Sequence, residues 1–223
     1  MLVVIGILIA LSINNWNEGQ KIEKTEKEIL QSLNIELQAN LKSLKAINDQ
    51  HKTEFEDGMS ILKTFGSDIS SIPTLKLDSI TTNAFAGYSF EARDGYIKSL
   101  IASNKIDYIE NAELKAFISS FESMVIDAVQ EEGYIRRLLN ERLWPATDGK
   151  LSFLNGNATF GGYEEFPKGT YESDYEWFFH SREMEDLTAN IMTWKKENIN
   201  DENTLIVRIV EMINLINIEL KEK

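Results

Sequence analysis

A long stripe of apolar residues at helical spacing constrains this chain more than any other feature. No proline occurs before Pro73, and from Glu18 to about Phe65 apolar residues recur at helical spacing. Between Ile29 and Leu62, with His51 counted as a member of the stripe, each step is three or four residues and the mean is about 3.7, closer to the 3.6 of a straight helix than to the 3.5 of a left-handed coiled coil. We therefore expect one long helix that packs within its own domain rather than in an extended dimer stalk. Its apolar positions are Ile22, Ile29, Leu33, Leu37, Leu41, Leu44, Ile47, Phe55, Met59, Leu62 and Phe65.

More helices follow the first one. Residues 66–74 are rich in Ser, Asp and Gly and predict a linker, and short helical pieces are expected near 79–87 and 91–103. Asn111 is a suitable N-cap for a strong helix that Pro145 is expected to end.

The end of the chain predicts two last helices, over 174–197 and 201–221, the second capped by Asp201. The fold class is therefore all-α, a bundle of about four main helices.

One segment departs from the helical pattern. Glycines and a second breaker, Pro167, follow Pro145 and argue against helix there. Alternating sequence on both sides of Asn155-Gly156, a strong signal for a two-residue turn, predicts a small β-hairpin insertion near 150–160.

The first residues form an uncharged apolar run, MLVVIGILIALSI, from Met1 to Ile13. As a helix this run covers about 20 Å, which is less than the hydrocarbon core of a bilayer at about 30 Å. A signal peptide would need a basic region before the run and a small-residue cleavage site after it, and a core helix would need a polar face. We therefore favour a partial membrane span whose first turns lie upstream of Met1.

Trp16 supports this reading, because tryptophan prefers the interface between lipid and water. The expected domains are a partial transmembrane helix over 1–16, which contacts the lipid bilayer, and a soluble helical domain over 17–223.

The segment LVVIGILIALSINNWNE, from Leu2 to Glu18, resembles the signature of an uncharacterised family of single-pass, N-terminally anchored membrane proteins from flavobacteria-like bacteria. The resemblance extends more weakly through the first 140 residues or so, and the Gly-containing insertion after Pro145 departs from it. It implies a basic cytoplasmic N-terminus and an exported domain, and hence an inner-membrane protein with a periplasmic soluble part. It implies no activity.

The charge and the cysteine content of the chain limit which classes of partner and site are expected. The chain has 36 Asp+Glu against 23 Lys+Arg, a formal charge of −13, which repels phosphate backbones and excludes nucleic acid as an expected partner. It has no cysteine, which excludes disulfides and thiolate sites. A protein partner or self-association is expected instead.

The two histidines are the natural candidates for acid-base or metal chemistry. His51 fills a gap in the apolar stripe and is interpreted as structural. His180 has Glu176 and Glu183 on neighbouring helical turns, but two or three surface ligands without another His or Cys do not predict a metal site. No HExxH, GxSxG or GxxxxGK[ST] motif occurs, so we expect no catalytic residues, no cofactor, no metal and no enzyme.

An unusual aromatic cluster remains, and rigid aromatic side chains on an irregular segment are typical of interaction surfaces. The alternative is that these rings hold the segment onto the bundle. The candidate surface residues are Tyr163, Phe166, Tyr171, Tyr175 and Trp177.

These observations favour a membrane-anchored interaction or scaffolding protein of the cell envelope. The alternative is an extracytoplasmic sensory or ligand-binding domain, which would need a concave pocket with converging polar groups.

Overall fold

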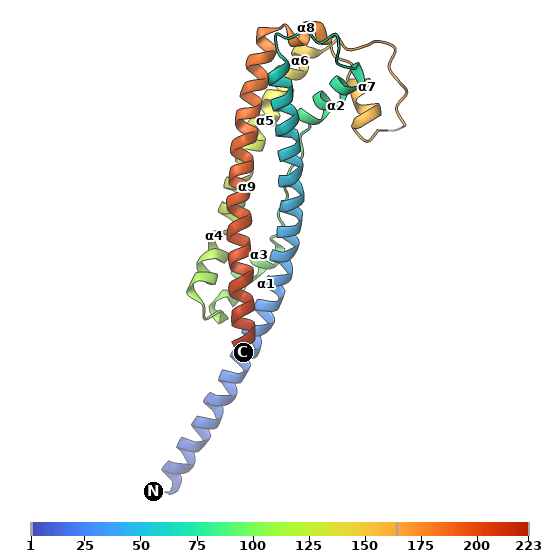
Figure 1. The fold of residues 1–223 in the computed structure, drawn as a ribbon. Coiled ribbons are helices and arrows are strands. Elements are labelled where there is room, and N and C mark those ends of the chain that lie inside the picture. Colours follow the sequence, from blue (N-terminus) through green and yellow to red (C-terminus); the bar gives the residue numbers. More distant parts are fainter. Residues whose placement is uncertain (1, 164, 223) are drawn as a thin grey trace. The chain divides into compact units, whose positions relative to one another are not determined.

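The computed structural model describes residues 2–163 and 165–222, and its helices account for most of them (Figure 1). No strand occurs among these residues, so the all-α prediction is confirmed. The α-helices are α1 (Leu2–Thr64), α2 (Thr74–Ala84), α3 (Gly95–Ala102), α4 (Ala112–Ala128), α5 (Gln130–Leu138), α6 (Trp144–Thr147), α7 (Phe153–Phe160), α8 (Tyr175–Phe179) and α9 (Arg182–Glu222), with a 3-10 turn at Lys105–Tyr108 and a π turn at Leu139–Leu143.

The chain divides into two compact units. Unit 1 comprises residues 1–43, 91–125 and 205–223. Its buried core includes Leu33 and Leu37 of the predicted stripe. Polar side chains of α1 fix the segments beside it: the Glu36 carboxylate accepts the N–H groups of Tyr96 and Ile97 and so caps the start of α3.

The predicted N-cap Asn111 is confirmed at the start of α4. The Asn111 side-chain oxygen accepts the backbone N–H groups of Glu113 and Leu114.

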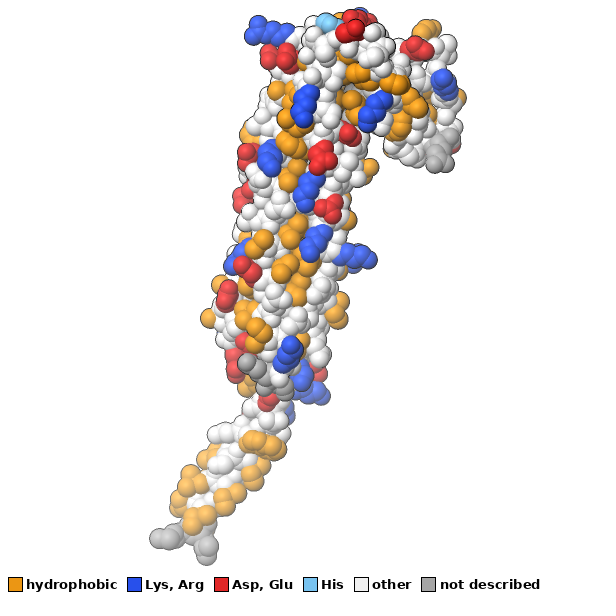
Figure 2. Space-filling view, in the orientation of Figure 1, with side chains coloured by type: hydrophobic (Ala, Val, Ile, Leu, Met, Phe, Trp, Pro, Cys, Tyr) orange, Lys and Arg blue, Asp and Glu red, His pale blue; other side chains and the backbone are white. Residues whose placement is uncertain are grey.

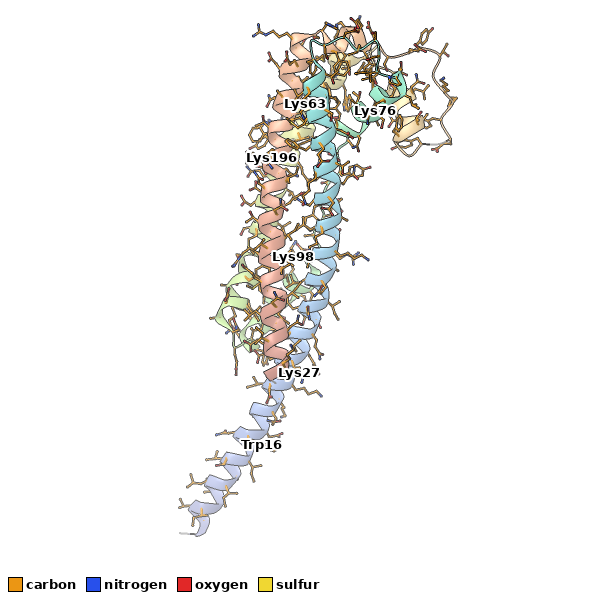
Figure 3. All side chains as sticks on the ribbon, viewed as in Figure 1. Trp16, Lys27, Lys63, Lys76, Lys98 and Lys196 are labelled. Carbon is orange, nitrogen blue, oxygen red and sulfur yellow. The ribbon has the colours of Figure 1, made fainter. Side chains whose placement is uncertain are left out.

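The first turns of α1 carry apolar side chains that no other part of the described chain covers (Figures 2 and 3). Trp16 is 68% exposed and projects from the helix. Within the residues that the structure describes, no helix is both long and apolar enough to cross a membrane. The exposed side chains are Val3, Val4, Ile5, Ile7, Leu8, Ile9, Leu11 and Ile13.

Unit 2 comprises residues 44–90 and 126–204. Its core centres on Phe178 and Phe179 of α8, which contact the Phe65 ring at 5.5 and 5.4 Å between centroids. Phe85, after α2, adds an edge-to-face contact with Phe178. Aromatic packing of this kind joins the short elements of unit 2 to its long helices.

The predicted β-hairpin near 150–160 is wrong, because residues 153–160 form helix α7. The Ser152 hydroxyl accepts the Asn155 N–H and caps the helix. The Asn155 amide accepts the Gly169 N–H and donates to the Tyr171 carbonyl. Asn155 therefore secures the loop that follows α7, and Asn155-Gly156 is not a turn.

Gly156 is needed for close packing. A Cβ at this position would lie 2.3 Å from Thr82 Oγ1 in α2. We expect Gly156→Ala to lower the free energy of unfolding by about 1–2 kcal/mol, because overpacking outweighs the gain in helix propensity. Gly133→Ala in α5 is the matched control, since nothing lies within 4 Å of its Cβ position, and it should stabilise by about 0.5–1 kcal/mol. Urea denaturation measures both changes in the free energy of unfolding. If both variants stabilise or both destabilise the protein, close packing at Gly156 is not the reason for its glycine.

Two predicted helix boundaries also need correction. Pro145 does not end its helix: the π turn Leu139–Leu143 leads directly into α6, where Pro145 occupies the first turn and needs no N–H partner. The two helices expected at the end of the chain are α8 and the single helix α9. Asp201 lies inside α9 and caps nothing, because no glycine or proline breaks the helix before it.

Candidate functional site

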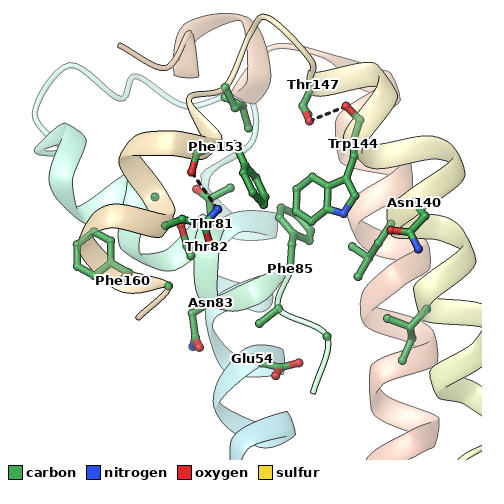
Figure 4. Close-up of a pocket in the computed structure, with 18 of the residues that line it drawn as sticks. Glu54, Thr81, Thr82, Asn83, Phe85, Asn140, Trp144, Thr147, Phe153 and Phe160 are labelled. Atoms are coloured by element: carbon green, nitrogen blue, oxygen red, sulfur yellow. Dashed lines mark hydrogen bonds between the residues drawn. The ribbon is translucent and has the colours of Figure 1, made fainter. Parts of the chain in front are cut away.

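Unit 2 contains a half-open cavity of about 1190 Å³ (Figure 4). Its walls come from α1, α2, α7, α9 and the run from α5 to α6. Four carboxyl groups line it against one lysine, one arginine and one histidine. These acidic and basic residues are Glu54, Asp78, Glu132, Asp148, Lys195, Arg136 and His51.

His51 of α1 and Glu202 of α9 form a buried pair, with His51 Nδ1 2.9 Å from a carboxylate oxygen of Glu202. His51 Nε2 lies 3.1 Å from the backbone carbonyl of Tyr88. Burial by itself lowers the pKa of His51, but the hydrogen bond and charge of Glu202 more than offset this effect, so the pKa is raised above its usual value. The histidine interpreted from sequence as structural thus belongs to a polar cluster.

Glu132 of α5 adds a second buried carboxyl group beside His51. One of its oxygens accepts the Phe90 N–H at 3.1 Å, and the other accepts the Ser89 hydroxyl. Burial raises the pKa of Glu132 in spite of these two hydrogen bonds.

Glu54 and Lys195 form a second buried pair between α1 and α9. The Lys195 ammonium also donates to the carbonyl of Ala86 at 3.0 Å. Burial raises the pKa of Glu54 and lowers the pKa of Lys195, even though each group attracts the other. The pair therefore carries a large desolvation cost that its mutual attraction offsets only in part.

Three buried oxygens around these pairs have no hydrogen-bond partner among the described residues: Asn48 Oδ1, Glu54 Oε1 and Asn198 Oδ1. Buried acceptors are normally satisfied, because an unpaired one costs about 1–3 kcal/mol. Glu54 lines the cavity, so a bound donor or cation would satisfy its free oxygen.

The other side of the cavity is aromatic. The Trp144 indole lies edge-on to Phe85, at 6.3 Å between centroids, and to Phe153, at 5.7 Å (Figure 4). Trp144 is half-buried, which leaves part of its ring available to a ligand.

The structure separates the five aromatic residues predicted as one surface. Tyr163 and Phe166 stack on each other at 5.2 Å and are exposed, and Tyr171 is 83% exposed. Tyr175 is buried and donates its hydroxyl to Asp78 at 2.6 Å. Trp177 is half-buried beneath the Lys150 ammonium.

His180 forms only a surface contact. Its Nδ1 lies 3.0 Å from the backbone carbonyl of Glu176 and 3.4 Å from the carboxylate of the same residue, and both side chains are exposed.

Comparison with known proteins identifies the family. A model described as "Family of unknown function (DUF6090)" matches residues 1–156. The chain belongs to this family. The region matched to DUF6090 contains His51, Glu54 and Glu132, whereas Lys195 and Glu202 follow it. No curated protein and no solved structure matched the chain.

Sequence reasoning missed the buried cluster, although the chain contains a signal for it. Lys195, Asn198 and Glu202 continue the apolar stripe of α9 at helical spacing between Ile191 and Leu205. Charged residues on the core face of a helix need partners, so such positions point to a buried polar network.

Proposed function

We propose that this chain is a membrane-attached ligand-binding protein of the bacterial cell envelope. Its cavity would hold a small organic molecule that carries a positively charged or hydrogen-bond-donating group. The observation that supports this proposal is the cavity of unit 2, in which buried charged side chains face an aromatic wall. The cavity favours the ligand-binding alternative over the scaffolding role.

The size and lining of the cavity suit such a ligand. Sites for small molecules usually occupy about 300–1,000 Å³ and combine aromatic walls with a few polar groups. This cavity is slightly larger and offers Trp144 and Phe153 for stacking. Its buried carboxyl group Glu54 has a free acceptor oxygen.

The charge of the lining favours a cation. Carboxyl groups outnumber basic side chains in the cavity, and the chain as a whole carries a formal charge of −13. An ammonium group would meet an attractive potential, and its N–H groups would pair with the Glu54 oxygen.

We also propose that the exposed apolar turns of α1 insert into the inner membrane and that the remaining residues lie in the periplasm. Apolar side chains on all sides of a helix favour lipid over water. Trp16 would then lie at the interface.

Titration with 2-phenylethylamine tests the ligand class, with phenylacetate as the charge-reversed probe. We expect the amine to quench tryptophan fluorescence and to raise Tm, and the acid to do neither. Trp144→Ala should weaken amine binding about two- to tenfold, because aromatic stacking contributes about 0.5–1.5 kcal/mol. Tyr171→Ala is the control, since Tyr171 does not line the cavity. Equal binding of the amine and the acid, or binding that survives Trp144→Ala unchanged, would reject the proposal.

An interaction surface is the second candidate. The exposed Tyr163–Phe166 stack and Tyr171 support it. This role would be favoured if Tyr171→Ala abolished binding of a protein partner and left binding of 2-phenylethylamine unchanged.

A further inference from the structure

The buried pair of His51 and Glu202, together with Glu132, has the geometry of a metal site. One ligand atom from each of the three side chains lies within 4.8 Å of the other two. All three side chains are buried, and they come from α1, α5 and α9 of unit 2. Imidazole and carboxylate groups are both common metal ligands in proteins.

The two ring nitrogens of His51 face different groups. Nε2 points at the carbonyl of Tyr88, so it carries a hydrogen in either protonation state. Nδ1 faces a Glu202 oxygen at 2.9 Å. A neutral His51 therefore directs a lone pair toward the carboxylate, and this contact becomes favourable with a positive charge there, either a proton on Nδ1 or a metal ion bound to both groups. Histidine ligands of metals usually donate their second N–H to a carbonyl in this manner.

Hydrogen bonds also fix the orientation of the Glu202 and Glu132 carboxylates. Asn48 donates to the second oxygen of Glu202 at 2.9 Å. Ser89 and Phe90 donate to Glu132. Each carboxylate oxygen has lone pairs left after these hydrogen bonds, and the donors fix its direction, as hydrogen bonds to the ligands of a metal ion usually do.

Asn198 gives an independent indication. Its Nδ2 lies 3.1 Å from His51 Nδ1 and 3.3 Å from a Glu202 oxygen, while its fully buried Oδ1 has no partner among the described residues. The oxygen and nitrogen of an amide are interchangeable by a half-turn. The turned amide would direct its oxygen at the same point as His51 and Glu202 and supply a fourth ligand, and its nitrogen would take the place of the present oxygen.

We propose that His51, Glu132, Glu202 and the Asn198 side-chain oxygen bind one divalent first-row transition-metal ion. One imidazole nitrogen with three oxygens suits Zn²⁺ or Mn²⁺ better than Ca²⁺ or Mg²⁺, which prefer oxygen ligands alone. The two negative charges of the carboxylates balance the ion. Because His51 and Glu132 line the cavity, the ion enters from there.

The test uses the full-length chain after treatment with a chelator and equilibration with Zn²⁺, Mn²⁺ or Mg²⁺. We expect bound Zn²⁺ or Mn²⁺ at one ion per chain by elemental analysis after gel filtration, a raised Tm, and little retained Mg²⁺. Glu202→Gln should weaken Zn²⁺ binding more than about 100-fold. His180→Gln is the matched control and should bind as the wild type does, since His180 lies on the surface.

A measurement on the wild type keeps the test independent of how well a variant folds. In a ¹⁵N spectrum of the histidine rings, Zn²⁺ should shift Nδ1 of His51 and leave His180 unchanged. Unshifted His51 nitrogens, or Zn²⁺ binding lost in His180→Gln but kept in Glu202→Gln, would overturn the proposal. Phenylethylamine binding is measured on the same metal-free protein, so the outcome for the metal and the outcome for the organic ligand stay separate.

Discussion

Lys195→Met is expected to lower the free energy of unfolding by about 3–5 kcal/mol, because it leaves a charged partner buried and unpaired. That partner is Glu54, whose side chain is fully buried. Urea denaturation followed by circular dichroism measures the change. An unpaired buried carboxyl has a raised pKa, so its cost grows as pH rises above the pKa of the unfolded chain. The loss should therefore be smaller at pH 5 than at pH 8.

Two further variants make this result specific. Lys196→Met changes the neighbouring exposed lysine, which lies 5.8 Å from the Phe55 ring, and should cost less than about 1 kcal/mol. Adding Glu54→Leu to Lys195→Met removes both charges and should recover most of the lost stability. If Lys195→Met lowered the free energy of unfolding as little as Lys196→Met does, solvent would have to reach the Glu54–Lys195 pair.

Ile7→Lys combined with Leu11→Lys is expected to abolish binding of the full-length chain to phospholipid vesicles. Each lysine costs about 2.5–3.5 kcal/mol in the hydrocarbon, and together they should reduce partitioning more than about a thousandfold. Both positions are exposed, so the fold should not change. Sedimentation with vesicles measures the bound fraction.

Ile35→Lys provides the matched control for the vesicle experiment. Ile35 is also an apolar residue of α1, 73% exposed, but it lies beyond the apolar run. It should leave vesicle binding unchanged. Equal loss in the control and in the double variant would indicate a general effect of charge rather than insertion of the first turns.

The long helices were predictable because their evidence is local. Leu33, Leu37 and Leu44 recur at helical spacing and are all fully buried. Asn155-Gly156 misled because a glycine serves both turns and close contacts, and only the position of Thr82 in space decides between them. The contact between His51 and Glu202 could not be predicted from local sequence patterns, because the two residues are 151 positions apart. Membership of an uncharacterised family was recognised from the sequence.

The buried Glu54–Lys195 pair has a consequence for biosynthesis. Glu54 leaves the ribosome long before its partner Lys195, which follows it by 141 positions. Until translation reaches α9, burial of the Glu54 carboxylate would lack its counter-charge and would be strongly unfavourable. Unit 2 therefore cannot complete its core before α9 has been synthesised, and a ribosome stalled before α9 would present a nascent chain that chaperones and proteases can still reach.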